Sequence, residues 1–358
     1  MKYAWKGSVL AALALLIAAS VVWAEPAPPA RPVRLVFIHH STGGNWLADS
    51  NEGGPYGGLG IALMNNNYHA SATNYGWGPN GIGDRTDIPD WPEWFTGENS
   101  TAIMSALFTE SGQNVDSFGD WSRLASVPSG ENLIILFKSC FPNSNLDGNP
   151  NDPPATSLSS DFTVANAKAV YNHLLTYFQT QPDKLFIAIT APPLMASETD
   201  ATRSANARAF ASWLVNDWLD GYPLSNVAVF DYYNVLTAPE NHHRWNNSAI
   251  EHVIGTASNT AYYPSDDSHP NTTGQQKATS EFVPLLNYWY QRWQSGGTDP
   301  ITPAASFFFP HIATINPWQT EIAVINTSAQ TVTGTLRGLS NGGQLLETKD
   351  ITLSAHGR

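Results

Sequence analysis

The sequence predicts an α/β protein whose parallel β-sheet is covered by helices on both faces. Apolar runs without polar alternation, which are typical of strands buried on both faces, recur at 33–38, 132–137, 185–190 and 227–230. Segments with helical spacing of apolar residues lie between or after them, at 161–179, 202–219 and 273–293. Strands that alternate with helices in this way favour a parallel sheet.

The N-terminal segment has the organisation of a secretory signal peptide. Lys2 and Lys6 precede an apolar run at 9–22, and Ala24 supplies the small residue of a cleavage site. An uncleaved membrane anchor is the alternative, but the run is short for a span of about 20 residues. We therefore predict cleavage after Ala24, a proline-rich leader at 25–32, and a secreted or periplasmic protein with no membrane span after signal cleavage.

Composition restricts the classes of partner. The chain has 358 residues and a formal net charge of −13, a balance that disfavours nucleic acid and anionic membranes as partners. The single cysteine, Cys140, excludes an internal disulfide. Thirteen tryptophans in a chain with only 13% charged residues suit either a sugar-binding surface, where indole rings stack on the ligand, or a tryptophan-rich core.

The predicted α/β domain at 33–294 contains one long stretch with little periodicity and is followed by a different pattern. Residues 45–99 are rich in Gly, Asn, Trp and Pro, a composition that predicts loops and one short helix near 58–64. We expect these loops to lie beside the functional site. A linker is expected at 295–305. Beyond it we predict a partial β-sandwich-like module at 306–358, because a complete sandwich has about 100 residues. Its short strands are expected at 312–315, 320–325, 332–338 and 344–352.

Two distant polar motifs carry the candidate chemistry. The first predicted strand ends in His-His-Ser-Thr-Gly-Gly (39–44), so Ser41 lies at the sheet edge where sites form in α/β proteins. Near the end of the domain, Asp266 and His269 lie three residues apart in Asp-Asp-Ser-His-Pro. A serine hydroxyl becomes nucleophilic when a histidine removes its proton and a carboxylate orients that histidine. The pattern predicts these roles for Ser41, His269 and Asp266; ordinary turn residues are the alternative.

These motifs resemble those of the SGNH hydrolases, also called the GDSL esterase/lipase superfamily. In that family the nucleophilic serine follows the first strand, and an Asp-x-x-His motif, often followed by Pro, lies near the domain end, as Ser41 and residues 266–270 do here. The resemblance covers about 33–293. It implies a flavodoxin-like three-layer α/β/α fold, ester hydrolysis through an acyl-enzyme, and no metal or organic cofactor.

The chain departs from the family pattern at two places. His39 and His40 stand where the family has Gly-Asp before its serine, and the Gly-x-Asn-Asp block is replaced by Lys-Ser-Cys-Phe-Pro-Asn at 138–143. Carried over residue by residue, the resemblance assigns the oxyanion hole to the Ser41 backbone N–H, the Asn143 side chain (alternatively Asn145) and Gly81 (alternatively Gly83).

Other interpretations of these residues remain open at this point. His39 and His40 could join His242 and His243 as metal ligands, but adjacent strand residues point to opposite faces and chelate poorly. Cys140 is expected to be a buried structural thiol. The leading hypothesis is an exported serine esterase acting on small-molecule or glycan esters, with acylated carbohydrate as one candidate substrate. The alternatives are a non-catalytic carbohydrate-binding or surface protein on a degenerate hydrolase scaffold, and a glycan-modifying transferase using the same triad.

Overall fold

The computed structural model describes residues 25–52, 54–255, 258–299, 332–339 and 345–354. The chain divides into two compact units, Glu25–Thr302 and a second unit formed by Met1–Ala24 with Pro303–Arg358. The predicted signal peptide at 1–24 and the expected strands at 312–315 and 320–325 lie outside the described residues.

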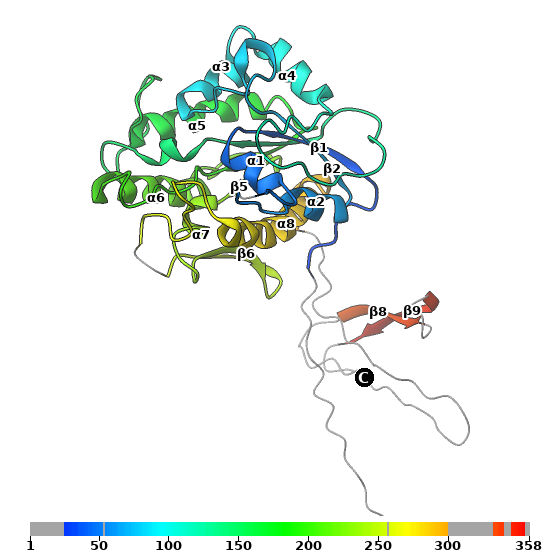
Figure 1. The fold of residues 1–358 in the computed structure, drawn as a ribbon. Coiled ribbons are helices and arrows are strands. Elements are labelled where there is room, and N and C mark those ends of the chain that lie inside the picture. The colour runs from blue at the N-terminus through cyan, green and yellow to red at the C-terminus, as the bar shows by residue number, and fades with distance from the viewer. Residues whose placement is uncertain (1–24, 53, 256–257, 300–331, 340–344, 355–358) are drawn as a thin grey trace, which may run out of the picture. The chain divides into compact units, whose positions relative to one another are not determined.

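A five-stranded, fully parallel sheet forms the centre of the first unit (Figure 1). Its strand order is β2-β1-β3-β4-β5, which is the flavodoxin-like order. The strands are β1 (Val33–Ile38), β2 (Tyr68–Ala72), β3 (Ile134–Lys138), β4 (Leu185–Ile189) and β5 (Val227–Phe230). The predicted α/β class with a helix-flanked parallel sheet is therefore confirmed.

Each face of the sheet has its own hydrophobic core because successive strand side chains point to opposite faces. On β1, Leu35 and Phe37 belong to one core, whereas Val36 and Ile38 belong to the other. The first core is closed by α1 (Thr42–Leu47), α2 (Leu59–Asn65) and α8 (Thr272–Gln294). The second is closed by α3 (Trp91–Thr96), α4 (Ser100–Thr109), α5 (Val164–Phe178) and α6 (Ala201–Asn216). Figure 1 shows α3, α4 and α5 on one side of the sheet and α2 and α8 on the other.

The predicted helices and four of the five strands agree with the structure to within a few residues, and the short helix expected near 58–64 is α2. The prediction of loops across 45–99 is wrong at β2, whose sequence Tyr-His-Ala-Ser-Ala has no apolar run. All five of its residues are nevertheless buried, because β2 pairs along its length with β1 and is covered on both faces. Pairing, not composition, makes this segment a strand.

Two antiparallel strand pairs lie outside the five-stranded sheet. The hairpin of β6 (His242–Asn246) and β7 (Ala249–Val253) follows the short helix α7 (Tyr232–Val235) and was not predicted. In the second unit, β8 (Val332–Leu339) pairs with β9 (Leu345–Leu353), in agreement with the last two strands expected there. Three 3₁₀ turns lie in the loops of the first unit: η1 (Pro79–Gly81), η2 (Ile88–Asp90) and η3 (Phe141–Ser144). Among the described helices, none has the length and apolarity needed to cross a membrane.

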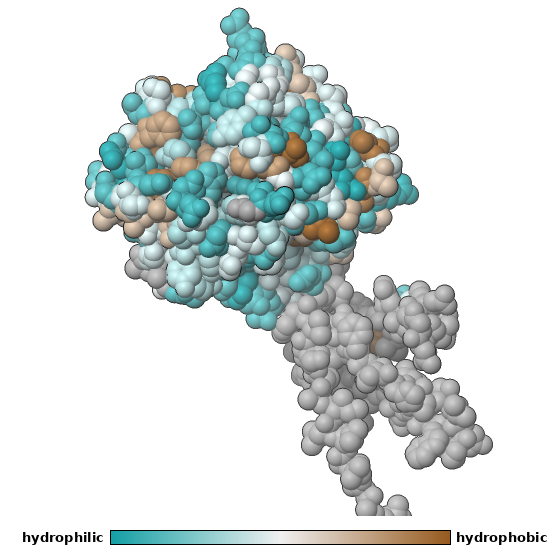
Figure 2. Space-filling view, in the orientation of Figure 1, coloured by the Kyte–Doolittle hydropathy of each residue, from teal (hydrophilic) through white to brown (hydrophobic). Residues whose placement is uncertain are grey.

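Most tryptophans of the first unit serve its cores. Of the ten in the described residues, six are buried and the other four are half-buried. On the face drawn in Figure 2, hydrophobic residues form small separate groups among hydrophilic ones. Core packing therefore accounts for six of the ten tryptophans in the described residues of this unit. The buried tryptophans are Trp46, Trp91, Trp94, Trp121, Trp218 and Trp289.

Candidate active site

Ser41 occupies a strained turn between β1 and α1. Its φ of 50° and ψ of −110° lie outside the regions that non-glycine residues usually adopt. The turn is closed by hydrogen bonds from Gly43 N to His40 O (3.2 Å) and from Gly44 N to Ser41 O (2.8 Å). Strain of this kind persists only where the surroundings enforce it, and it clusters at functional sites.

The glycines after Ser41 are required by close packing. A Cβ on Gly43 would lie 2.5 Å from Cγ of the His39 ring, and one on Gly44 would lie 2.7 Å from the Phe118 ring. His39 is itself buried under this turn, and burial lowers the pKa of its imidazole well below the usual value. A neutral His39 ring thus forms the floor of the Ser41 turn.

The structure brings Ser41 and His269 together from opposite ends of the domain. The Ser41 hydroxyl forms a hydrogen bond with Nε2 of His269. His269 lies in the loop before α8, whose ends are held by bonds from Ser265 N to His269 O (2.8 Å) and from Asn271 N to Tyr263 O (2.7 Å). The edge of the Phe141 ring packs against the His269 imidazole, with ring centroids 5.0 Å apart.

The carboxylate that contacts His269 is Asp267, not the predicted Asp266. Both Asp267 oxygens lie 2.8 Å from His269 Nδ1, and Oδ1 also accepts the His269 backbone N–H at 2.8 Å. The tight turn folds the Asp267 side chain back onto residue i+2, and both Asp266 and Asp267 are exposed. Partial burial raises the pKa of Asp267, but the hydrogen bonds and charge of His269 outweigh it and lower that pKa overall.

A buried hydroxyl anchors the Asp267–His269 loop to the chain after β4. Ser268 is fully buried and accepts a hydrogen bond from Met195 N at 2.9 Å. Its own hydroxyl donates to the Glu198 carboxylate. The residue between the carboxylate and the imidazole is therefore fixed by two contacts to a neighbouring loop.

The residues expected to complete an oxyanion hole are engaged elsewhere. The Asn143 amide donates to Asp87 Oδ1 (2.7 Å) and to Cys140 O (3.3 Å), while its oxygen accepts Ile88 N (2.7 Å). The side-chain oxygen of the alternative Asn145 accepts a bond from the Thr199 hydroxyl at 3.0 Å, a contact that engages its oxygen and not its amide N–H groups. The N–H of Gly81 donates to Gly78 O, and that of Gly83 donates to Trp77 O. Asn143 and Gly81 thus hold loops together, in contrast to the prediction that they present free donors to the substrate.

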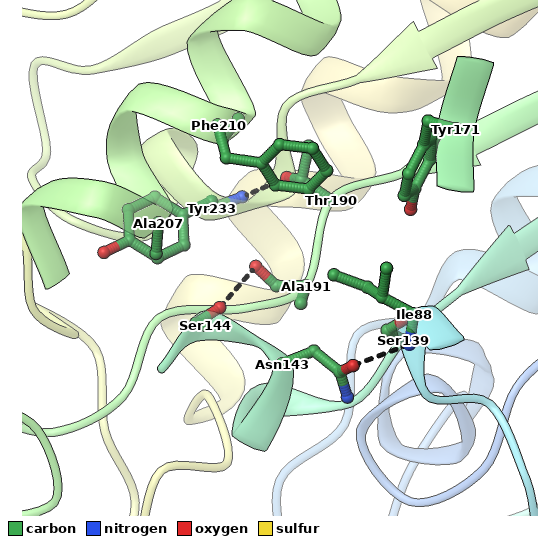
Figure 3. A pocket seen from close by; sticks show the side chains of 11 residues that line it. Ile88, Ser139, Asn143, Ser144, Tyr171, Thr190, Ala191, Ala207, Phe210 and Tyr233 are labelled. Atoms are coloured by element: carbon green, nitrogen blue, oxygen red, sulfur yellow. Dashed lines mark hydrogen bonds between the residues drawn. The ribbon is translucent and has the colours of Figure 1, made fainter. Parts of the chain in front are cut away.

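A small cavity lies behind Asn143 (Figure 3). Figure 3 shows the Asn143 side chain directed at Ile88, with Ser139 beside them and Thr190 across the cavity, next to Tyr233. Its volume of about 10 Å³ has room for about one water molecule. Ser41 and His269 do not line it.

Tyr75 is the residue at this site that sequence reasoning missed. It follows β2, its ring stacks on the His40 ring with centroids 4.9 Å apart and planes at 20°, and it is 46% exposed. Its ring thus lies beside His40, the residue that precedes Ser41. The only sequence signal was its place in the glycine-rich loop after residue 72, because the contact depends on the unpredicted pairing of β2 with β1.

A buried cation lies under the Ser41 turn. Lys138, fully buried at the end of β3, donates from Nζ to the Thr42 hydroxyl at 2.6 Å and to Ser139 O at 3.1 Å. The Thr42 hydroxyl lies 3.8 Å from the Cys140 sulfur. Burial of Cys140 raises the pKa of its thiol, but the Lys138 ammonium and a hydrogen bond with His40 lower it overall.

The two histidine pairs considered as metal ligands have separate surroundings. His40 contacts Thr86 and Cys140, whereas His242 and His243 contact Glu281 from β6. Across the residues that the structure describes, no group of three or more His, Cys, Asp or Glu side chains is placed to hold a metal ion.

Comparison with known proteins adds two distant structural similarities. No family model matches the chain, and no curated protein matches it. A carbohydrate esterase family 2 enzyme with a carbohydrate-binding domain, from Corynascus thermopiles (Myceliophthora fergusii), is 13% identical, with 74% of this chain and 69% of that chain covered and a TM-score of 0.33. A second solved structure is 13% identical over 71% of this chain and 96% of that chain, with a TM-score of 0.32. The fold assignment rests on the strand order and pairing of this chain itself: it is an α/β protein with a flavodoxin-like parallel sheet.

Proposed function

We propose that this protein is an exported serine ester hydrolase of the SGNH type. The observation that carries the proposal is the hydrogen-bonded chain from Ser41 through His269 to Asp267. A serine, an imidazole and a carboxylate in this order are the parts of a general-base-activated nucleophile. The strained turn after the first strand and the resemblance of the two motifs to the SGNH family support the same assignment.

In the proposed reaction Ser41 Oγ attacks the ester carbonyl carbon while His269 Nε2 takes the hydroxyl proton. The carbonyl electron pair moves onto oxygen, and collapse of this intermediate expels the alcohol, which takes the proton from His269. Water, activated by the same imidazole, then hydrolyses the acyl-enzyme. Asp267 stabilises the imidazolium and fixes the tautomer that leaves Nε2 free to accept. Small-molecule esters and acylated glycans are the proposed substrate classes.

Labelling with a fluorophosphonate probe tests this proposal directly, because only an activated serine reacts. We expect labelling of the native protein and none of the Ser41→Ala variant, together with loss of p-nitrophenyl acetate hydrolysis in that variant. Full hydrolysis by Ser41→Ala would overturn the proposal. Comparing release of acetate from an acetylated glycan with that from the aryl ester would rank the two substrate classes.

A non-catalytic binding protein on a hydrolase scaffold is the second candidate. The engaged amide of Asn143 and the engaged N–H of Gly81 favour it, because both were expected to stabilise the oxyanion. A well-folded protein that resists the fluorophosphonate but binds glycans would support this candidate. Export is a separate proposal, which depends on residues 1–24: an N-terminus at Glu25 in the secreted protein would support it.

A further inference from the structure

The helix α1, which begins directly after Ser41, has little support of its own. It has six residues, and two of the first three are glycines, which are among the weakest helix formers. Ser41 stands at the N-cap position, where a serine side chain commonly accepts a backbone N–H of the first turn. Here it makes no such bond, and its hydroxyl contacts His269 instead. The start of α1, and with it the Ser41 turn, therefore needs an anchor from elsewhere in the chain.

Lys138, the last residue of β3, is that anchor. Its Nζ donates to the hydroxyl of Thr42, the first residue of α1, at 2.6 Å, and to Ser139 O at 3.1 Å. Both Lys138 and Thr42 are fully buried. Lys138 can reach Thr42 because β3 lies beside β1: Phe137 pairs with Ile38, so the residues that follow leave the sheet side by side.

The Lys138 ammonium has no carboxylate to balance its charge. None of the ion pairs among the described residues includes it. Burying a charge is costly unless the charge is paired and hydrogen-bonded, so a lysine at this position destabilises the fold by itself. Its two hydrogen bonds, and the Cys140 sulfur 3.8 Å from the Thr42 hydroxyl, offset part of this cost. A core built for stability alone would have an apolar side chain here.

We propose that Lys138 is a positioning residue of this site, whose ammonium holds the Ser41 turn in place through the Thr42 hydroxyl. The inference rests on the proposed function, in which Ser41 must be held against His269. It is carried by the 2.6 Å bond from Lys138 to Thr42, by the burial of both side chains, and by the missing side-chain cap at Ser41. Because Lys138 acts through Thr42, it should affect kcat and not the binding of substrate.

The titratable groups around Lys138 leave it as the group that changes charge at mildly alkaline pH. Burial lowers the pKa of its ammonium to about 8, while the charge of Cys140 opposes this shift. Other titratable groups interact electrostatically with this pair, namely His39, His40, Tyr75 and Tyr232. Burial lowers the pKa of His39 and raises the pKa of both tyrosines, so these three stay uncharged at neutral pH.

The anchor should consequently depend on pH. Below about pH 8 Lys138 is an ammonium, and it forms charge-assisted hydrogen bonds with Thr42 and Ser139. Above that pH it loses its proton, and the neutral amine forms hydrogen bonds that are roughly half as strong. The Ser41 turn is then held less firmly, so we expect kcat of the native protein to fall as the pH rises through about 8.

Lys138→Met tests the inference because it removes the ammonium and keeps a side chain of similar length. We expect kcat for p-nitrophenyl acetate to fall by about 10–100-fold, since moving a catalytic group by up to about 1 Å can cost this much. KM should change little, and the fall of kcat near pH 8 should be absent. Lys184→Met is the matched control, which should keep the native kcat and the native pH profile. Lys184 is also buried, but it precedes β4 at the opposite edge of the sheet and contacts Glu131 at 2.6 Å.

Further variants decide the question even if Lys138→Met does not fold. Thr42→Val removes the hydroxyl that Lys138 contacts and should lower kcat as Lys138→Met does, whereas Thr42→Ser keeps the hydroxyl and should retain most of kcat. Cys140→Ser removes the charge that raises the pKa of Lys138. In that variant the alkaline fall of kcat should therefore begin at a lower pH than in the native protein.

The outcomes separate the inference from the proposed function. If folded Lys138→Met keeps the native kcat and the native pH profile while Ser41→Ala is inactive, the role of Lys138 is wrong and the hydrolase proposal stands. A native kcat that stays constant as the pH rises through about 8, or a Thr42→Ser variant as impaired as Thr42→Val, would also overturn this role. If Ser41→Ala is as active as the native protein, the hydrolase proposal itself fails.

Discussion

At the scale of single residues, Asp266 and Asp267 are neighbours in the chain, but only the Asp267 carboxylate lies against the His269 ring. We expect Asp267→Asn to lower kcat/KM for an aryl ester by about 10²–10⁴-fold, because an amide no longer holds the productive imidazole tautomer. Asp266→Asn is the matched control and should stay within a few-fold of the native rate. Equal losses in both variants, or a larger loss in Asp266→Asn, would contradict the observed geometry.

In the proposed hydrolase, Ser268 would position the loop that carries Asp267 and His269, and this role can be tested separately from theirs. Ser268→Ala removes the contacts to Met195 N and the Glu198 carboxylate. We expect kcat to fall by about 10–100-fold, since displacing a catalytic group by a fraction of an ångström to about 1 Å can reduce the rate by up to about this factor. The substrate KM should change little, and Ser268→Thr should restore most of kcat. An unaltered kcat in Ser268→Ala would show that the loop is held by its backbone bonds alone.

The sequence could indicate Ser41 and His269 as candidates because a strand-end serine and a His-Pro loop are visible as patterns. It could not choose between two adjacent carboxylates, because the choice depends on how a five-residue turn folds its side chains. Nor could it show that Asn143 is engaged by Asp87, which is 56 positions away in the chain. Tyr75 was missed for the same reason: its stacking on His40 requires the pairing of two strands, one of which has no apolar signal.

Among the structural elements, the turn from β1 into α1 is the most tightly constrained. Gly43→Ala would place a Cβ 2.5 Å from the buried His39 ring, so we expect a loss of about 1–3 kcal/mol in the free energy of unfolding. Gly221→Ala is a useful comparison, because Gly221 has a φ of +77° but nothing within 4 Å of the added Cβ. Its loss should be about 1 kcal/mol, from backbone strain alone. Urea titration of both variants measures the difference; equal losses would argue against the His39 contact.

The β6–β7 hairpin carries a titratable cluster packed against β5 and α8. His243 Nδ1 accepts Asp231 N (2.9 Å), its ring stacks on Phe230, and the neighbouring His252 donates to Asp231 at 2.7 Å. Burial, with the charge of His252, lowers the pKa of His243 to about 3, although Asp231 opposes the shift. The folded state therefore favours neutral His243, whereas the unfolded chain takes up a proton below about pH 6.5.

The stabilisation that comes from keeping His243 neutral in the folded state should consequently be present in full above about pH 6.5. It should be lost progressively as the pH falls toward 3. Thermal melts between pH 7 and pH 4 measure this loss. We expect His243→Gln to be less stable at pH 7 but to show a shallower fall in Tm with acidification, whereas His173→Gln on α5 should keep the native slope. A native slope in His243→Gln would rule out His243 as a main source of acid sensitivity.

The elements that the sequence predicted share one property: their own residues supply the signal. Strands β4 and β5 are apolar throughout, and β1 and β3 are apolar except for Arg34 and Lys138, because both faces of these strands are covered. By contrast, β2 is buried by its pairing with β1, and the β6–β7 hairpin is held by polar contacts to Glu281 on α8. Tertiary contacts, which no local pattern reports, decide the state of these two segments.

For the whole molecule, the two cores on either side of the sheet draw all their buried residues from positions 33–289. The proposed nucleophile, base and carboxylate belong to the same unit, Glu25–Thr302. We therefore expect a chain consisting of residues 25–302 to fold with native thermal stability and to be labelled by a fluorophosphonate at the rate of the full chain. Activity on a soluble aryl ester should likewise be unchanged, because every contact that fixes Ser41, His269 and Asp267 is retained. If the shortened chain folds but hydrolyses only a glycan ester more slowly, residues 303–358 act in substrate capture. If it fails to fold, the division of the chain into two independent units is wrong, and the stability of the sheet depends on contacts with the C-terminal residues.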